Sequence, residues 1–341
     1  MCTLKNKRTG KSLKDKIEHE RDHLINSRRS FLWNTGLAGA SMMLPFKNNL
    51  LKAASLNPFL SAVNQAENNR ILVLVRLDGG NDGLNTIVPR GITQEKYQQK
   101  RSQLFIPEQD LSNTIIDDSN AFNPTFSQLM PMWKEGNMAA IHNVAYENPS
   151  YSHFRATDIW ATATESNIYE DRGWLGRYID TIMPAFSEAP PVMPVALEVG
   201  DVAELAFQGK YNSTSLSINS VEQFYSIAQN GKLYDTNFLG NCNRDQEILF
   251  LREIANSSFY YKDAIQEAFD ASFAKSPAKV YPATSLGERL HIISQMIKGG
   301  LGTKIYMVSL GSFDTHNDQN DRHTPLSVSY THLTLPTICS V

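Results

Sequence analysis

The sequence predicts an α/β protein built around a sheet of largely buried strands. Two short apolar and β-branched runs, Ile71–Val75 and Lys304–Leu310, are typical of strands that are covered on both faces. Each run leads into a polar, acid-containing turn, Asp78–Gly83 after the first and Gly311–His316 after the second. Open α/β sheets bind ligands at the carboxyl ends of their strands, so we expect a functional site at these two turns.

Composition places the chain among ordinary globular proteins. It has 341 residues, 41% of them hydrophobic and 20% charged, which allows one large or two ordinary domains with a substantial core. The net charge of −3 gives no electrostatic reason to expect a nucleic-acid partner. The three cysteines are scattered and form neither a disulfide framework nor a zinc motif. No run approaches the roughly 18 consecutive apolar residues of a membrane span.

Residues 1–69 have the order of parts found in an export signal followed by a linker. A basic region leads into the hexapeptide SRRSFL, which contains Arg28 and Arg29 and resembles the twin-arginine signal, and a short apolar stretch rich in small residues follows at Leu37–Phe46. A basic amphipathic helix on the domain surface is the alternative, but the whole arrangement favours export. We therefore expect the twin-arginine translocation machinery as a partner and a periplasmic or cell-surface location. This pathway carries folded proteins, which suits a protein that takes up a metal in the cytoplasm.

The turn after the first strand, DGGNDG, offers groups that bind cations and groups that bind anions. Asp78 and Asp82 could hold a cation, and the glycines would let backbone N–H groups approach an anion. Taken alone, a tight turn filled with residues that tolerate positive φ explains the pattern better. A nicotinamide-binding oxidoreductase is a poor third explanation, because the G-x-G-x-x-G spacing is missing and an acid would face the pyrophosphate.

The next part of the chain is predicted to contain two helices and a second buried strand. The helical segments are Gln94–Gln103, which is polar, and Pro124–Lys134, whose apolar residues recur at helical spacing, with a loop between them. The apolar run Met138–Val144 is predicted to be a strand. His142 lies near the carboxyl end of that run and is an additional candidate ligand.

A helix is predicted to begin at Ser152, because Phe154, Ile159 and Trp160 can share one helical face. A serine at this position caps the free N–H groups of the first turn, and local sequence favours that role. A hydroxyl at a helix N-terminus also lies where phosphate or sulfate binds and where a metal can activate a nucleophile, so Ser152 is the candidate catalytic residue. His153 follows it as an additional candidate ligand.

The middle of the chain, about residues 185–285, is predicted to be an insertion or cap together with helices. Residues 201–241 are rich in Ser, Asn and Gly, which favours a cap over the central sheet. Arg244–Ala274 has helical spacing, and Asn256–Ser258 is a candidate break within it. The remaining predicted elements are the helices Gly173–Met183 and Ser285–Lys298 and the strand Val192–Val199.

The second strand-end turn, GSFDTH, is the better candidate for a metal site. Asp314 and His316 supply an oxygen and an imidazole ligand of the kinds that divalent cations bind, and His323 is a further candidate. A polar loop whose histidine only caps or hydrogen-bonds explains an isolated motif equally well. Two strands that end in acids, and a third that ends near His142, favour the metal site.

The chain resembles an exported family, domain of unknown function 1501, over about residues 28–326. Four motifs carry the resemblance in order: LVLVRLDGGNDGLNTIVP, YSHFRATDIWATAT, DRGWLGRYID and VSLGSFDTHNDQNDRH. That family is grouped with the alkaline-phosphatase-like superfamily, which includes sulfatases. The resemblance implies a three-layer α/β/α sandwich with a mixed, mostly parallel sheet. It assigns Asp78, Asp314 and His316 to a metal and places Ser152 in the region where superfamily enzymes hold their nucleophile. The family has no settled activity, so hydrolysis is inherited by analogy of fold.

The chain departs from the family at its carboxyl end. Family members continue with an acid-Phe-Gly-Arg-Thr motif and a later Asp-His-Gly motif that supply further ligands, and neither occurs here. Residues 328–341 instead resemble translated adapter sequence. We therefore expect residues 70–327 to be a C-terminally truncated alkaline-phosphatase-like domain with at best half of a two-metal site, inactive by itself, and residues 328–341 to be a non-native tail.

Two functions from different classes follow from these patterns. The first is an exported, metal-dependent hydrolase that acts on phosphate or sulfate esters. A divalent metal (Zn, Mn, Ca or Mg) would be held by Asp78, Asp314 and His316, and Ser152 would attack or position a small anionic ester or glycan substrate. The second is a non-catalytic exported scaffold or surface-binding protein that has kept the fold.

Overall fold

The computed structural model describes residues 70–142, 144–186, 190–200, 203–236, 242–275, 281–316 and 318–338. The predicted export signal and linker at residues 1–69, with Arg28 and Arg29, lie outside these ranges and stay a prediction. Within the described ranges, no helix combines the length and the apolar content needed to cross a bilayer. Residues 328–338, from the expected tail, belong to the last helix, α13 (Gln319–Ile338).

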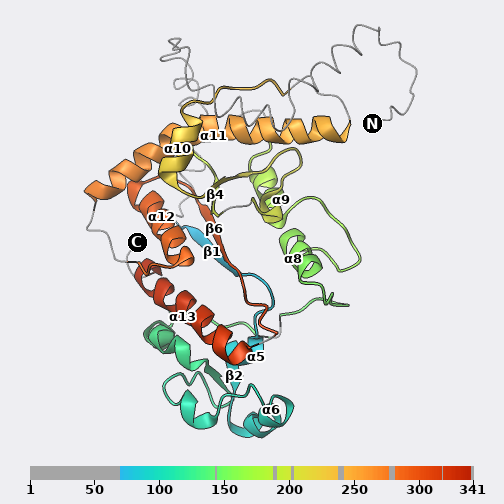
Figure 1. Cartoon of the computed structure of the whole chain (residues 1–341), viewed down its shortest axis with the longest axis vertical. Coiled ribbons are helices and arrows are strands. Elements are labelled where there is room, and N and C mark those ends of the chain that lie inside the picture. Colours follow the sequence, from blue (N-terminus) through green and yellow to red (C-terminus); the bar gives the residue numbers. More distant parts are fainter. Residues whose placement is uncertain are drawn as a thin grey trace.

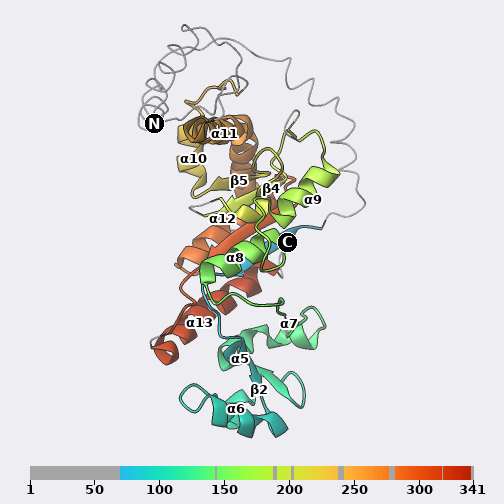
Figure 2. The ribbon, with the colours of Figure 1, turned by 90° about the vertical axis from the view of Figure 1, so that its right-hand side faces the viewer.

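The centre of the fold is a four-stranded sheet in the order β1 (Leu72–Leu77), β6 (Ile305–Leu310), β4 (Ala196–Val199) and β5 (Ser215–Ile218). All three pairs of neighbouring strands are parallel (Figures 1 and 2). β1 and β6 are far apart in the sequence but adjacent in the sheet, with Leu77 opposite Leu310. The two polar turns that follow these strands therefore meet at one edge of the sheet, as predicted.

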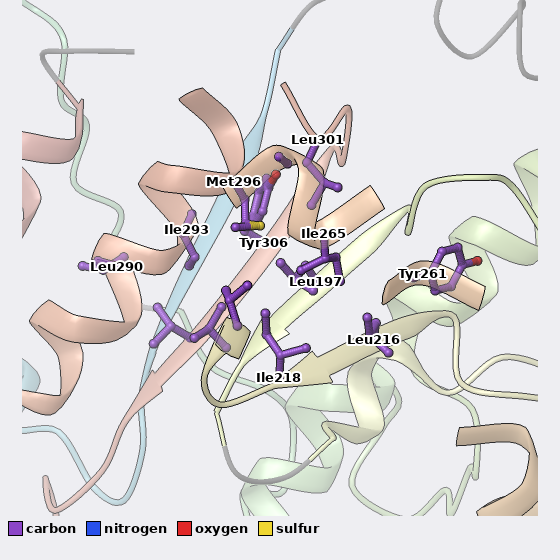
Figure 3. Close-up of a cluster of buried hydrophobic side chains, with 14 of the residues drawn as sticks. Leu197, Leu216, Ile218, Tyr261, Ile265, Leu290, Ile293, Met296, Leu301 and Tyr306 are labelled. Carbon is purple, nitrogen blue, oxygen red and sulfur yellow. The ribbon is translucent and has the colours of Figure 1, made fainter. Parts of the chain in front are cut away.

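One face of the sheet carries the larger hydrophobic cluster. Side chains alternate across a strand, and on this face Leu197, Leu216 and Tyr306 pack against two long helices, α11 (Asn243–Ala274) and α12 (Ser285–Gly299) (Figure 3). The shorter helix α10 (Val221–Ala228) also packs against α11.

The opposite face carries a second hydrophobic cluster, in which Ala196, Ile305 and Met307 of the sheet take part. Three elements cover it: α8 (His153–Thr162), α9 (Trp174–Ile182) and the 3-10 turn η4 (Leu205–Phe207). Helices on both faces are expected of a parallel sheet, whose strands are buried on both sides. The predicted α/β class is therefore confirmed.

The ends of the main helices follow local signals in the sequence. Thr284 caps α12 by accepting a hydrogen bond from the Gly287 N–H at 3.2 Å, and Gly300 ends that helix with a φ of 87°, which glycine adopts without strain. Ser152 caps α8, accepting a hydrogen bond from the Arg155 N–H at 3.4 Å. The capping role predicted for Ser152 is confirmed.

Residues 83–137 form a second lobe, which lies below the sheet in Figures 1 and 2. It has its own buried clusters, one around Val88 and Leu111 and one around Phe122 and Phe126. Helix α13 packs against the 3-10 turn η3 (Pro124–Leu129) of this lobe and against α12. The elements of the lobe are α5 (Gly83–Thr86), β2 (Ile87–Pro89), η1 (Gly91–Thr93), α6 (Gln94–Lys100), η2 (Glu108–Leu111), β3 (Asn120–Phe122), η3 (Pro124–Leu129) and α7 (Met130–Lys134), with β2 and β3 antiparallel.

The strand predicted over Met138–Val144 is wrong. Residues 138–142 and 144 have no strand partner, and the side chains of Ile141 and Val144 are each 80% exposed. Met138 and Ala140 pack instead against the cluster of the second lobe that contains Phe122. A short apolar run forms a strand only where a sheet edge is available to pair with it, and here Met138 and Ala140 partly bury their side chains without one.

Two predictions for the middle of the chain are corrected as well. Residues 201–241 supply β5 to the central sheet, where Leu216 and Ile218 point into the core and the intervening serines had obscured the pattern. The candidate break at Asn256–Ser258 does not occur, and α11 is continuous. The side chain of Asn256 exchanges hydrogen bonds with the backbone of Tyr234, at 2.7 and 2.9 Å, so it does not compete with its own helix.

Candidate metal site at the carboxyl edge of the sheet

The two strand-end turns are joined by their backbones. The Asp78 N–H donates to the Leu310 carbonyl at 2.8 Å, and the Phe313 N–H donates to the Asp78 carbonyl at 3.2 Å. These bonds continue the β1–β6 ladder past the last paired residues and bring the turn after β1 against the loop after β6. The N-terminus of α8 reaches the same place, because the ring of its first residue, His153, lies beside Gly80.

Three side chains from these segments form a cluster in which one carboxylate lies between two imidazoles. The Asp314 Oδ2 is 3.3 Å from His153 Nε2, and the Asp314 Oδ1 is 2.8 Å from His316 Nε2. The two imidazole rings are 6.0 Å apart between centroids. One ligand atom from each of the three residues lies within 4.8 Å of the other two. Among the described residues, these three form the only group of three or more His, Cys, Asp or Glu side chains that are this close.

The chemistry of this donor set fits a divalent cation. Two imidazole nitrogens and a carboxylate oxygen are ligands of the kind that zinc and other transition metals bind, and catalytic sites use three such ligands while leaving a position open. The cluster opens to solvent, since the side chains of His153 and Asp314 are 43% and 41% exposed and that of His316 is 78% exposed. His153, Asp314 and His316 could therefore hold an ion that an external molecule can reach.

Asp78, which the sequence suggested as a ligand, is adjacent to the cluster but does not belong to it. Its carboxylate lies 3.4 Å from the guanidinium of Arg76. Arg76 in turn makes a bidentate ion pair with Glu204, at 2.6 and 2.8 Å. Residues two apart on a strand point to the same side, so the Arg-x-Asp spacing at the end of β1 was a signal for this pairing.

A network of polar side chains lies on the face of the sheet that α8 covers, and it includes Arg76, Glu198 and Glu204. Glu198, in the middle of β4 and only 2% exposed, accepts a hydrogen bond from the Ser215 hydroxyl and one from the Glu204 N–H at 2.8 Å. Burial raises the pKa of the Glu198 carboxyl to about 7, although the Ser215 hydrogen bond opposes the rise. Arg76 lies 5.6 Å from the ring centroid of Trp160 in α8. The network was not predicted, although the sequence carries a signal for it, an acid inside the apolar run of β4.

Two further candidates, Asp82 and His323, meet in a different cluster that attaches α13 to the turn after β1. Asp82 pairs with Arg101 and accepts a hydrogen bond from the Gln319 side chain. Burial raises the pKa of Asp82, but the hydrogen bonds from Arg101 and Gln319 outweigh it and hold that pKa below its usual value. The His323 Nε2 lies 3.3 Å from Asn81 Oδ1, and burial lowers the pKa of this imidazole.

The last two candidates from the sequence, Ser152 and His142, lie in different parts of the structure. Ser152 is exposed at the start of α8, directly before His153. His142 is exposed in the segment after the second lobe and is not part of the His153 cluster. Its charge acts on Asp117, whose pKa is lowered mainly by hydrogen bonds from the Ser119 N–H and the Asn120 side chain. Ser152 therefore neighbours the cluster through the chain, as the residue before His153, and His142 lies outside the cluster.

Comparison of the chain with models of protein families, with curated proteins and with solved structures found no match.

Proposed function

We propose that this protein is hydrolase-like and binds a divalent metal through His153, Asp314 and His316, and that relatives carrying the two motifs missing here use this ion to hydrolyse phosphate or sulfate esters. The observation that carries the proposal is the placement of one carboxylate between two imidazoles at the sheet edge, with distances of 3.3 and 2.8 Å to their Nε2 atoms. Segments far apart in the sequence supply these groups. Open α/β folds bind ligands at this edge.

Each group of the site has a role in the proposed reaction. A divalent ion bound there would stabilise charge on the ester oxygens and lower the pKa of a nucleophile. Ser152 carries a hydroxyl next to His153 and would attack or position the ester. The free N–H groups of the first turn of α8 favour an anionic group at that end of the helix. His153 and His316 would hold the ion together with Asp314.

The wider setting belongs to the same proposal. The parallel sheet with helices on both faces and the four motifs support an alkaline-phosphatase-like sandwich and membership of the exported family named in the sequence analysis. Export by the twin-arginine machinery to the periplasm or cell surface rests on Arg28, Arg29 and the residues around them. The substrate would be a small anionic ester or an ester group on a glycan, and Zn, Mn, Ca or Mg are the candidate ions.

Metal content tests the proposal directly. We expect the purified full chain to retain about one divalent ion per molecule, measured by elemental analysis after dialysis. Asp314→Ala should weaken the affinity for that ion by more than about 100-fold, because it removes the carboxylate that both imidazoles face.

Asp263→Ala is the matched control. Asp263 is an exposed acid on α11, paired with Lys262 at 2.9 Å, so its removal should leave the metal content unchanged. A wild-type chain that binds none of Zn, Mn, Ca or Mg would refute the proposal.

The alternative function is a non-catalytic exported scaffold or surface-binding protein. One observation favours it: the imidazole of His316 is largely exposed. A panel of phosphate and sulfate monoesters separates the two functions. A homologue that also carries the acid-Phe-Gly-Arg-Thr and Asp-His-Gly motifs should turn over at least one of them with added metal if the protein is a hydrolase, and none if it is a scaffold.

A further inference from the structure

The turn after β1 touches two residues of the candidate metal site through glycines. A Cβ atom built on Gly80 would lie 2.7 Å from His153 Cε1 and 3.4 Å from His153 Nε2. A Cβ atom on Gly79 would lie 2.7 Å from the Asp314 backbone nitrogen, and Gly79 also has a φ of +116°. Contacts between carbon and these atoms at 2.7 Å are too close to persist, so a side chain at either position forces its neighbour to move.

The two glycines differ in what would have to move. At Gly79 the obstacle is backbone and the φ value is one that L residues rarely adopt, so a substitution there strains the fold itself. At Gly80 the φ is not in the left-handed region, and the three atoms nearest to the added Cβ all belong to the imidazole of His153. An alanine at position 80 can therefore keep the turn, but it displaces the His153 ring.

The His153 ring has little freedom to move without losing its place in the site. Its Cε1 atom faces Gly80 and its Nε2 atom faces the Asp314 carboxylate at 3.3 Å. These two atoms are bonded neighbours in the ring, so a shift away from Gly80 changes the position of the nitrogen that would bind the ion.

We propose that Gly80 is a positioning residue for the metal site: the missing side chain at position 80 lets the His153 imidazole lie against the turn with its Nε2 directed at Asp314. This inference rests on the proposed metal-binding function where the test measures metal affinity. Where the test measures the NMR resonance of His153, it rests only on the contact between Gly80 and His153. It gives the turn after β1 a role in the site that is separate from any ligand role of Asp78.

The test compares Gly80→Ala with Gly83→Ala. Gly83 lies in the same turn region at the start of α5, and a Cβ atom there would have no neighbour within 4 Å. We expect Gly80→Ala to weaken Zn²⁺ binding, measured by competition with a chromophoric chelator, by about 10- to 100-fold, as removal of outer-shell support does at metal sites. Gly83→Ala should bind Zn²⁺ as the wild type does.

A second readout does not need the metal. The Cε1–H resonance of His153 in the metal-free protein, assigned by its loss in His153→Ala, should shift in Gly80→Ala and stay in place in Gly83→Ala. A double-mutant cycle completes the test: in the His153→Ala background, adding Gly80→Ala should cause no further loss of Zn²⁺ affinity, because the displaced ring is gone.

Each outcome decides between specific alternatives. If the wild type binds no Zn²⁺, the proposed function is in doubt, while the Cε1–H resonance still tests the role of Gly80. The inference is overturned if the His153 Cε1–H resonance has the same position in Gly80→Ala as in Gly83→Ala. It is also overturned if Gly80→Ala lowers the Zn²⁺ affinity equally in the wild type and in the His153→Ala background. If Gly80→Ala fails to fold, adding His153→Ala should restore folding, and failure to do so would also overturn it.

Discussion

Glu198 shows how a single residue can set a pH dependence of folding. Its carboxyl is buried in the middle of β4, and burial raises its pKa from 4.5 to about 7. The unfolded chain releases this proton near pH 4.5, whereas the folded chain keeps it until about pH 7. Between these values the folded state binds more protons, so the free energy of unfolding falls as pH rises.

Glu198→Gln should remove that pH dependence. Relative to the wild type, we expect the variant to gain about 2–4 kcal/mol of stability between pH 4 and pH 8, because the amide cannot ionise. Denaturant unfolding at several pH values measures it. Glu95→Gln, at an exposed residue of α6, is the control and should leave the wild-type pH profile unchanged. Parallel profiles for Glu198→Gln and the wild type would show that burial does not raise this pKa.

At the scale of elements, α12 is the clearest case of sequence, packing and stability agreeing. Its apolar residues recur at helical spacing, and Leu286 is buried against the sheet and α11. Leu290, Ile293 and Met296 are buried in the same cluster (Figure 3). Because a cap and a terminal glycine also mark its ends, local and long-range signals specify the same helix. Its burial should therefore contribute strongly to stability.

Ile293→Ala tests the contribution of α12. We expect it to lower the free energy of unfolding by about 2–5 kcal/mol, because Ile293 is fully buried and its truncation leaves a cavity. Ile227→Ala in α10 is the matched control, since Ile227 is 58% exposed and should cost well under 1 kcal/mol. Chemical denaturation of both variants gives the comparison, and similar losses would contradict the assignment of Ile293 to the core.

At the scale of the whole molecule, α13 connects the parts of the fold. It packs against α12 and against the second lobe, and its His323 and Gln319 contact the turn after β1 at Asn81 and Asp82. The turn that carries Gly80 is therefore held from both ends, by the sheet on one side and by α13 on the other. His323 is 4% exposed, and its ring also packs edge-on against Phe313 at 6.2 Å.

His323 should make this attachment sensitive to acid. Burial lowers its pKa below the ordinary value of 6.5, so the unfolded chain takes up the proton first and stability falls as pH drops below about 6.5. We expect wild-type stability to decrease more than that of His323→Gln between pH 8 and pH 5. Thermal unfolding at both pH values measures the difference, with the exposed His142→Gln as control. An equal decrease in all three proteins would rule this role out.

The features that depend only on neighbouring residues could be predicted from the amino-acid order. The apolar runs at β1 and β6, the spacing and ends of α12, the cap at Ser152 and the Asp-x-His pair were all predicted before any contact was known. The meeting of the two turns at one sheet edge also followed, because parallel strands that lie side by side end on the same side.

The distant partner of each group became clear from the folded arrangement alone. It gave Asp314 the imidazole of His153, gave Asp78 the guanidinium of Arg76, and left residues 138–142 and 144 unpaired. It placed β5 in the central sheet and kept α11 whole through the contacts of Asn256. Strand pairing and side-chain partners are long-range choices among competing neighbours, whereas helix caps and short motifs are set within a few residues.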